Sequence, residues 1–197
     1  MPEIPATSKA GLRAAALARR DALDDEARRA ADAAIAESAM RLLEPLRFQC
    51  LSGFLPIRSE CDPRPVMDAA LGRGADVALP AFIDRETMVF RSYSPGDPLV
   101  AAGFGTREPG AGAAVVAPDV ILMPLAAFDR SGTRIGYGKG HYDRAIATMR
   151  RAGRDPLLVG LAFSVQEVDR IPAEPHDVRL DRLVTDRGVF DFRGDQS

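Results

Sequence analysis

The sequence has few of the features that mark disulfide-stabilised, zinc-stabilised or membrane proteins. Its two cysteines, Cys50 and Cys61, are eleven positions apart, which is neither a zinc-ligand spacing nor a disulfide framework and predicts a reducing compartment. The longest apolar run, residues 120–128, contains Pro124 and is far shorter than the roughly 20 residues that span a bilayer. The opening residues lack the apolar core of a signal peptide. These absences predict a soluble, cytoplasmic protein without a membrane partner.

An excess of charge of either sign is also missing. The 26 basic and 28 acidic residues leave a net charge of −2, too little positive field for sequence-independent DNA or RNA binding. An RNA-binding accessory protein would also need interleaved aromatic and basic residues, which the sequence does not show. We therefore expect small-molecule partners and no nucleic acid. The oligomeric state is left open, with a monomer as the simplest expectation.

Lysine and histidine are both scarce. Of the 26 basic residues 24 are arginine, and the two lysines are Lys9 and Lys139. In a chain whose basic residues are nearly all arginine, a remaining lysine can mark a position that needs a compact ammonium group rather than a planar guanidinium. Chance explains the two lysines equally well. The two histidines are His141 and His176.

The chain does have enough apolar residues for a real core. Its 197 residues, 46% of them hydrophobic, have the length of one domain, since domains hold roughly 100–200 residues. We treat residues 1–197 as a single domain, with an N-terminal helical pair over 8–43 and a tail over 190–197. The first helix is expected from Ser8, as its N-cap, to about residue 23, and the second over 25–43.

Strands alternate with helices over the remainder. Strands are predicted at 48–55, 76–79, 87–93, 120–124, 157–163 and 182–185, helices at 63–72 and 142–151, and turns between 94 and 118. The runs at 120–124 and 157–163 are continuously apolar, as in strands buried on both faces. The order predicts an α/β fold: a three-layer, open, mostly parallel sheet with helices on both faces and the N-terminal helical pair packed alongside.

One segment combines a buried strand, a glycine-rich loop and the start of a helix. Residues 132–144 read GTRIGYGKGHYDR, in which Gly136, Gly138 and Gly140 alternate and Lys139 lies among them. Glycines let backbone N–H groups approach phosphate oxygens, and a helix N-terminus favours an anion. The loop therefore predicts a phosphate site beyond the carboxyl end of a strand, where open α/β sheets bind ligands. An ordinary glycine-rich turn is the alternative.

Two familiar phosphate motifs are excluded by single positions. A P-loop needs glycine where Thr133 stands, and serine or threonine where Gly140 stands. The dinucleotide fingerprint needs glycine at the position of His141. The glycine-rich loop is therefore a candidate phosphate-binding loop that matches neither motif.

The loop resembles the signature of the 5-formyltetrahydrofolate cyclo-ligase (5,10-methenyltetrahydrofolate synthetase) family. Further blocks similar to the family, in its order, are SKAGLRAAALARR (8–20), FLPIRSECD (54–62), DVALPAF (76–82), GTREP (105–109), DVILMPLAAFD (119–129), GLAFSVQ (160–166) and IPAEPHDVRLDRLVTDRGV (171–189). The likeness spans residues 8–189. It implies a fold similar to that of sugar-phosphate isomerases and CoA-transferases.

The resemblance implies a ligase that uses ATP and magnesium. ATP phosphorylates the formyl oxygen of 5-formyltetrahydrofolate, N10 attacks that carbon, and loss of phosphate leaves 5,10-methenyltetrahydrofolate and ADP. Phosphoryl transfer asks a protein mainly for positioning and charge stabilisation. That agrees with a sequence in which we identify no Ser-His-Asp or Cys-His constellation.

The resemblance also implies the site residues. For ATP these are Lys9, Ala10, Gly11, Leu12 and Arg13 of the opening helix and Arg134, Ile135, Gly136, Tyr137, Gly138, Lys139, Gly140, His141 and Tyr142 of the loop. Arg134 and Lys139 are the catalytic residues, through their charge on the phosphates. For the folate they are Leu55, Glu60, Tyr137, Gly138, Lys139, Gly140 and His141, and for magnesium Asp143 and Asp177.

Each of the main assignments has an ordinary alternative. Lys9 and Arg13 could be an exposed basic pair. Asp143 could be a carboxylate that complements a helix dipole, and Asp177 could form part of an Asx-turn. Glu60 could be an ordinary surface residue, and Leu55 an ordinary core residue. His141 departs from the family, which often has tyrosine there; its ring can still stack, and we expect it to bind rather than act as a base. His176, after Pro175, is expected in a loop, where it would orient Asp177.

Two other functions stay open at this stage. A sugar-phosphate isomerase or CoA-transferase-like enzyme would need a catalytic carboxylate and would bind phosphate without nucleotide hydrolysis. A non-catalytic folate- or nucleotide-binding protein would have lost turnover. The presence of Lys9, Lys139, Asp143 and Asp177 argues against the second.

Overall fold

The two N-terminal helices begin where the sequence supplies caps. Helix α1 (Lys9–Asp21) follows Ser8, whose hydroxyl oxygen accepts a hydrogen bond from the Gly11 N–H at 3.1 Å. Helix α2 (Asp25–Leu43) follows Asp24, whose carboxylate accepts one from the Ala27 N–H at 2.8 Å. The prediction of a helix over 25–43 is confirmed. The computed structural model describes residues 7–195, and no helix in that range combines the length and hydrophobicity needed to cross a bilayer.

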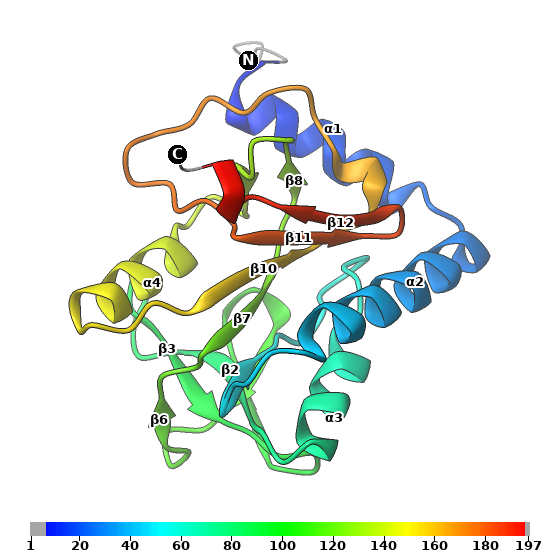
Figure 1. The fold of residues 1–197 in the computed structure, drawn as a ribbon. Helices are drawn as coiled ribbons and strands as arrows, with labels where there is room; N and C mark the ends of the chain where they lie inside the picture. The colour runs from blue at the N-terminus through cyan, green and yellow to red at the C-terminus, as the bar shows by residue number, and fades with distance from the viewer. Residues whose placement is uncertain (1–6, 196–197) are drawn as a thin grey trace.

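An eight-stranded sheet lies at the centre of the molecule, in the order β12-β11-β10-β7-β1-β2-β3-β6 (Figure 1). Its strands are β1 (Cys50–Ser52), β2 (Asp76–Phe82), β3 (Met88–Ser92), β6 (Val115–Val116), β7 (Val120–Pro124), β10 (Leu157–Leu161), β11 (Arg182–Thr185) and β12 (Gly188–Asp191). The run from β11 to β2 pairs in parallel, and β12, β3 and β6 add antiparallel edges. The predicted mostly parallel sheet is confirmed.

Several short elements were not predicted. Strand β4 (Leu99–Ala101) pairs with β5 (Arg107–Pro109), and β8 (Ala127–Phe128) with β9 (Arg134–Ile135); the 3₁₀ helices are η1 (Gly103–Gly105), η2 (Ser164–Gln166) and η3 (Arg193–Asp195). The segment 94–118, predicted as turns, thus contributes three strands. The expected tail 190–197 begins inside β12, and residues 196–197 lie outside the described range. Strands this short show too little periodicity to be read from sequence.

Helices cover both faces of the sheet, as predicted. Helices α2 and α3 (Arg64–Gly72) pack on one face and α4 (His141–Arg151) on the other (Figure 1). Strand β7 serves both cores, because Leu122 points to the α2–α3 side and Met123 to the α4 side.

The N-terminal helices do not form a separate paired layer. Whereas α2 lies in the layer over the sheet, α1 lies across one end of it (Figure 1). There Ala16 packs against Ala127, Ile135 and Ile171, which follow the carboxyl ends of the strands. The two helices do not pair because the apolar face of α1 is covered by these loops rather than by α2.

The chain order creates a topological switch between β1 and β7. From β1 the chain continues through α3 to β2 on one side, whereas β7, β10 and β11 extend the sheet on the other. The loops after β1 and β7 therefore diverge at the carboxyl edge of the sheet, which is where such sheets bind ligands.

Candidate functional site

A narrow crevice, too tight in this structure to hold a water molecule, lies at this switch point. It is lined by Arg20, Phe54, Glu60, Cys61, Pro124, Leu125, Leu161 and Gln166. Burial raises the pKa of the Cys61 thiol well above its usual value, so this cysteine is not a thiolate nucleophile. Gln166, also buried, donates from Nε2 to the carbonyl oxygens of Leu125 at 2.7 Å and Ala126 at 3.1 Å, which holds the chain after β7.

Glu60 is a buried acid of this crevice, with 8% of its surface exposed. Its Oε1 accepts a hydrogen bond from the Tyr137 hydroxyl at 2.7 Å, and its Oε2 accepts one from the Ile57 N–H at 2.9 Å. Burial raises the pKa of Glu60, against the opposing effects of Ile57, Tyr137 and the Arg20 charge. The alternative of a surface glutamate is wrong. The structure instead joins Glu60 to the glycine-rich loop, through Tyr137.

Arg20 completes this network, and the sequence analysis did not identify it. Its side chain is 1% exposed; Nε donates to the Ser59 hydroxyl at 2.9 Å and Nη1 to the Tyr137 hydroxyl at 3.2 Å. A signal was present in the sequence. Leu12, Ala16 and Arg20 recur at intervals of four, which places Arg20 on the apolar face of α1.

Helix α1 also directs its two predicted ATP residues toward the loops. The Lys9 Nζ lies 2.6 Å from Oδ2 of Asp177 and 3.4 Å from Oε2 of Glu174. The Arg13 Nε donates to the Gly136 carbonyl at 2.7 Å. Both side chains are partly buried against segments predicted to form the site, so they are not the exposed basic pair of the alternative.

The glycine-rich loop takes a shape that depends on its glycines. Gly138 has φ +87° and Gly140 has φ +62°, in the region that side chains rarely adopt. A Cβ at Gly138 would lie 3.2 Å from a guanidinium nitrogen of Arg13. Gly140 is the N-cap of α4 and has no side chain to cap that end, while Asp143 places a carboxylate in the first turn. Lys139 is exposed between these two glycines.

The predicted magnesium ligands lie on neighbouring segments. Asp143, in the first turn of α4, accepts at Oδ1 from Arg134 Nη2 at 2.8 Å and from the Val178 N–H at 3.1 Å. Arg134 also donates to the Val178 carbonyl. Because Val178 follows Asp177, the fold brings two aspartates close together that are 34 positions apart in the sequence.

Asp177 belongs to a cluster of possible metal ligands. Among the residues that the structure describes, ligand atoms of Glu174, His176 and Asp177 lie within 4.8 Å of one another. Partial burial acts to raise the pKa of Asp177, but hydrogen bonds from Lys9 and the Glu174 N–H hold it below its usual value. The carboxylates here and at Asp143 are donors of the kind that Mg²⁺ prefers, whereas the imidazole of His176 is not. The donor set therefore fits Mg²⁺.

His141 makes contacts that the sequence did not indicate, whereas Leu55 packs as one of its two predictions had it. The His141 ring packs edge-on against Phe82, with centroids 4.7 Å apart, and its Nε2 lies 3.0 Å from the Arg85 carbonyl oxygen. His141 thus links the start of α4 to the β2–β3 hairpin. Leu55 is partly buried against the core on the α2–α3 side, as its alternative predicted.

Tyr142 carries a buried hydroxyl for which the described residues provide no hydrogen-bond partner. Burial, and then the negative charge of Glu60, raise its pKa above the usual value, so it is a neutral donor. Buried polar groups nearly always have a partner. An acceptor atom of a ligand would supply one.

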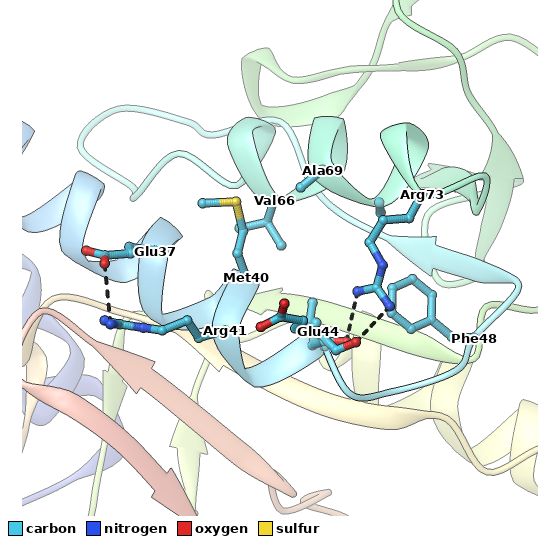
Figure 2. Close-up of a pocket in the computed structure, with 10 residues that line it drawn as sticks. Glu37, Met40, Arg41, Glu44, Phe48, Val66, Ala69 and Arg73 are labelled. Atoms are coloured by element: carbon cyan, nitrogen blue, oxygen red, sulfur yellow. Dashed lines mark hydrogen bonds and ion pairs between the residues drawn. The ribbon is translucent and has the colours of Figure 1, made fainter.

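A larger hollow of about 330 Å³ lies between α2 and α3, away from all of these residues (Figure 2). Met40, Phe48 and Val66 are among its apolar lining residues. Arg73 at its edge donates to the carbonyl oxygens of Leu43 at 3.0 Å and of residues 44 and 46, and lies over the Phe48 ring. The hollow holds none of the predicted site residues, and its arginine closes the end of α2. It is a packing groove between helices.

Comparison with known proteins gives one consistent result. Residues 5–186 match the model of the 5-formyltetrahydrofolate cyclo-ligase family. The chain is 34% identical to the 5-formyltetrahydrofolate cyclo-ligase of Mycolicibacterium smegmatis, over 94% of this chain and 98% of that one. It is 32% identical to the Escherichia coli K12 protein of that name, over 71% and 79% of the two chains.

Solved structures agree with this result. The 5,10-methenyltetrahydrofolate synthetase of Aquifex aeolicus superposes with a TM-score of 0.76 at 31% identity, covering 96% of this chain and 95% of that one. The synthetase of Mycoplasma pneumoniae, at 23% identity, shares the fold with a TM-score of 0.74 over 90% and 98% of the chains.

Proposed function

The chain belongs to the 5-formyltetrahydrofolate cyclo-ligase family, and from that premise we propose that it converts 5-formyltetrahydrofolate and ATP to 5,10-methenyltetrahydrofolate, ADP and phosphate. The observation that carries the proposal is the junction formed by Tyr137. Its loop provides phosphate-binding geometry, and its hydroxyl bonds to the buried acid Glu60. One site can therefore hold a nucleotide and a second, ring-shaped substrate side by side.

The Glu60 side suits the folate. A pterin presents an amino group and a ring N–H, and a buried carboxylate accepts hydrogen bonds from both. Glu60 is already held by Ile57 and Tyr137, so little ordering is needed when the substrate binds. Tyr137, more than a third exposed, can cover the bound ring.

The other side suits the triphosphate. Lys9 and Arg134 are paired with Asp177 and Asp143. With ATP bound, Lys9 and Arg134 would pair with the phosphates, and Asp177 and Asp143 would be free to hold Mg²⁺. Bound there, Mg²⁺ would neutralise phosphate oxygens and fix their geometry.

The chain's own residues then assist the chemistry in three ways. Lys139 and Arg134 stabilise charge on the phosphoryl group as it moves to the formyl oxygen. The N–H groups at the start of α4 hold phosphate oxygens. The loop around Tyr137 keeps water away from the phosphorylated formyl carbon until N10 attacks it and phosphate leaves.

The test is a coupled measurement on the purified protein. With 5-formyltetrahydrofolate, ATP and Mg²⁺, we expect the absorbance of the methenyl product to rise together with ADP release. Folded protein that forms no product would exclude the cyclo-ligase activity. ADP release without methenyl product would indicate a different phosphoryl acceptor, and binding of both substrates without turnover would indicate the non-catalytic alternative.

A further inference from the structure

The buried guanidinium of Arg20 joins three parts of the chain. It lies on α1, donates from Nε to Ser59 in the turn after β1, and donates from Nη1 to Tyr137 in the glycine-rich loop. With 1% of the side chain exposed, this charge has lost nearly all of its contact with water. A buried charge is costly unless it is hydrogen-bonded, so the position of Arg20 depends on these partners.

The turn that Arg20 holds is a strained one. Arg58 has φ +53°, a left-handed conformation that is unfavourable for a residue with a side chain. Ser59 is fixed on both sides, since its hydroxyl donates to the Asp21 carboxylate and its carbonyl accepts from Arg28 Nη1 at 3.3 Å. Glu60 follows directly. The backbone that presents the Glu60 carboxylate is therefore anchored to α1.

Arg20 also determines the direction of the Tyr137 hydroxyl. That hydroxyl has one proton to donate, while its oxygen can accept. Arg20 has only donors, so its bond occupies the oxygen and leaves the proton for Glu60. Without Arg20 the hydroxyl would be free to rotate away from the carboxylate.

We propose that Arg20 is a positioning residue for the folate, which fixes both the 57–60 turn and the Tyr137 hydroxyl so that Glu60 is presented as an acceptor. The inference rests on the proposed function. Lys9 and Arg13 of the same helix contact the phosphate side instead. Loss of Arg20 should therefore affect the folate and spare ATP.

The charge of Arg20 gives a second, independent readout. The groups that face Glu60 are Arg20 from α1, Tyr137 from the loop, Tyr142 from α4 and the adjoining Cys61. Of these four, Arg20 is the one cation, and its charge favours the ionised carboxylate in addition to the hydrogen bond from Tyr137. Its removal should move the acidic limb of the pH profile for folate kcat/KM to higher pH.

The experiment compares Arg20→Gln with Arg19→Gln. Arg19, its neighbour on α1, is exposed and donates to the carbonyl oxygens of Val165 at 2.6 Å and Glu167 at 2.9 Å, away from Glu60. For Arg20→Gln we expect the KM for 5-formyltetrahydrofolate to rise about tenfold or more, the loss expected for a hydrogen bond to a charged group, with the KM for ATP within about twofold. Arg19→Gln should leave both unchanged. A folded Arg20→Gln protein with unchanged folate KM, or with equal losses for ATP, overturns the proposal.

Further variants keep the test decisive. Adding Tyr137→Phe to Arg20→Gln should cost less than the two changes separately, because both act through one hydroxyl; full additivity contradicts the proposal. If Arg20→Gln does not fold, Ser59→Ala removes the acceptor of Arg20 Nε together with the hydrogen bond to Asp21, keeps the bond from Arg20 to Tyr137, and should raise the folate KM about threefold. An unchanged folate KM in folded Ser59→Ala then overturns the proposal.

Direct binding separates this inference from the proposed function. The dissociation constant of 5-formyltetrahydrofolate without ATP, measured by calorimetry, should rise in Arg20→Gln and not in Arg19→Gln. A wild-type protein that binds the folate without turnover would refute the ligase and leave the role of Arg20 standing. Equal affinities of the two variants would refute the role of Arg20 even in an active enzyme.

Discussion

Helix α1 supplies both sides of the site, and the two sides are built differently. The Arg20 side chain is 1% exposed and donates to the hydroxyl groups of Ser59 and Tyr137, with the exposed Asp21 carboxylate farther away, 3.9 Å from Nε. The Lys9 side chain is 23% exposed, and its Nζ lies 2.6 Å from the Asp177 carboxylate. Burial raises the pKa of Glu60 on the first side, while ion pairing lowers that of Asp177 on the second. The difference teaches that the proposed folate side is fixed in advance by buried hydrogen bonds, and that the proposed phosphate side is held by ion pairs that a ligand can exchange.

The largest expected effect is on the phosphate side. Lys139→Ala should lower turnover at least tenfold, roughly the loss of one charged donor to a transition state, with little change in the folate KM. The measurement is kcat at saturating substrates. Arg150→Ala is the control, because Arg150 lies in the last turn of α4, away from the loop that holds Lys139, and is paired with the exposed Asp155. Wild-type turnover in Lys139→Ala would remove this lysine from the site.

The folate side should respond through binding. Glu60→Gln keeps the shape but loses the charge, so we expect the KM for 5-formyltetrahydrofolate to rise about tenfold while the KM for ATP stays constant. The two KM values measured in one titration series give the answer. A rise in the KM for ATP alone would show that Glu60 belongs to the phosphate side, and would contradict the division of the site into two sides.

Stability should change with opposite sign on the two sides. The pKa of Glu60 is raised in the fold above its ordinary 4.5, so its ionisation costs stability at neutral pH, and that cost disappears as the pH falls toward the ordinary value. Glu60→Gln should therefore raise the Tm at neutral pH. The pKa of Asp177 is lowered below its ordinary 3.8, so it contributes stability that is present above that value and lost as the pH falls through the folded pKa.

Asp177→Asn should accordingly lower the Tm at neutral pH, by about 2–4 °C for each 1 kcal/mol lost. Thermal unfolding across a pH series measures both variants, and the two differences from wild type should shrink in acid. Shifts of the same sign would show that both carboxylates sit in the same kind of environment.

The smallest expected effect concerns the loop between the sides. Gly138→Ala adds a Cβ at φ +87° beside Arg13, with a cost of about 1–2 kcal/mol, and should raise the KM for ATP a few-fold. Gly153→Ala is the matched control, since φ is +75° and nothing lies within 4 Å of the added Cβ. It should lower the Tm similarly without altering the KM. Equal KM changes in the two variants would contradict a role for the Arg13 contact.

The elements that could be predicted are those whose burial leaves a local pattern. Helix 25–43 and the strands at 120–124 and 182–185 were placed at their observed limits. Strands β4, β5 and β6 were missed because strands of two or three residues are too short to show an alternation of apolar and polar side chains. The predicted strand 48–55 proved to be β1, only Cys50–Ser52, because the chain after it leaves the sheet for the Glu60 turn.

For the site, sequence could predict residue types but not their partners. The glycine-rich loop and Lys9 were recognised from motif and resemblance, yet the contact of Lys9 with Asp177 joins positions 168 apart. Arg20 shared an apolar face with Ala16, but the same spacing fits an exposed arginine in an alanine-rich helix. His141 was expected to bind a ligand, and its observed contact is to the Arg85 carbonyl.

The longer helices and strands, the absence of large net charge and the glycine-rich loop were determined by the sequence alone, because periodicity, composition and backbone freedom are properties of neighbouring residues. The burial of Glu60, the loss of water around Arg20 and the placing of Asp143 and Asp177 on neighbouring segments were decided only by the tertiary structure. These depend on the switch between β1 and β7, which brings loops from distant parts of the chain to one edge and sets how much solvent each charge retains.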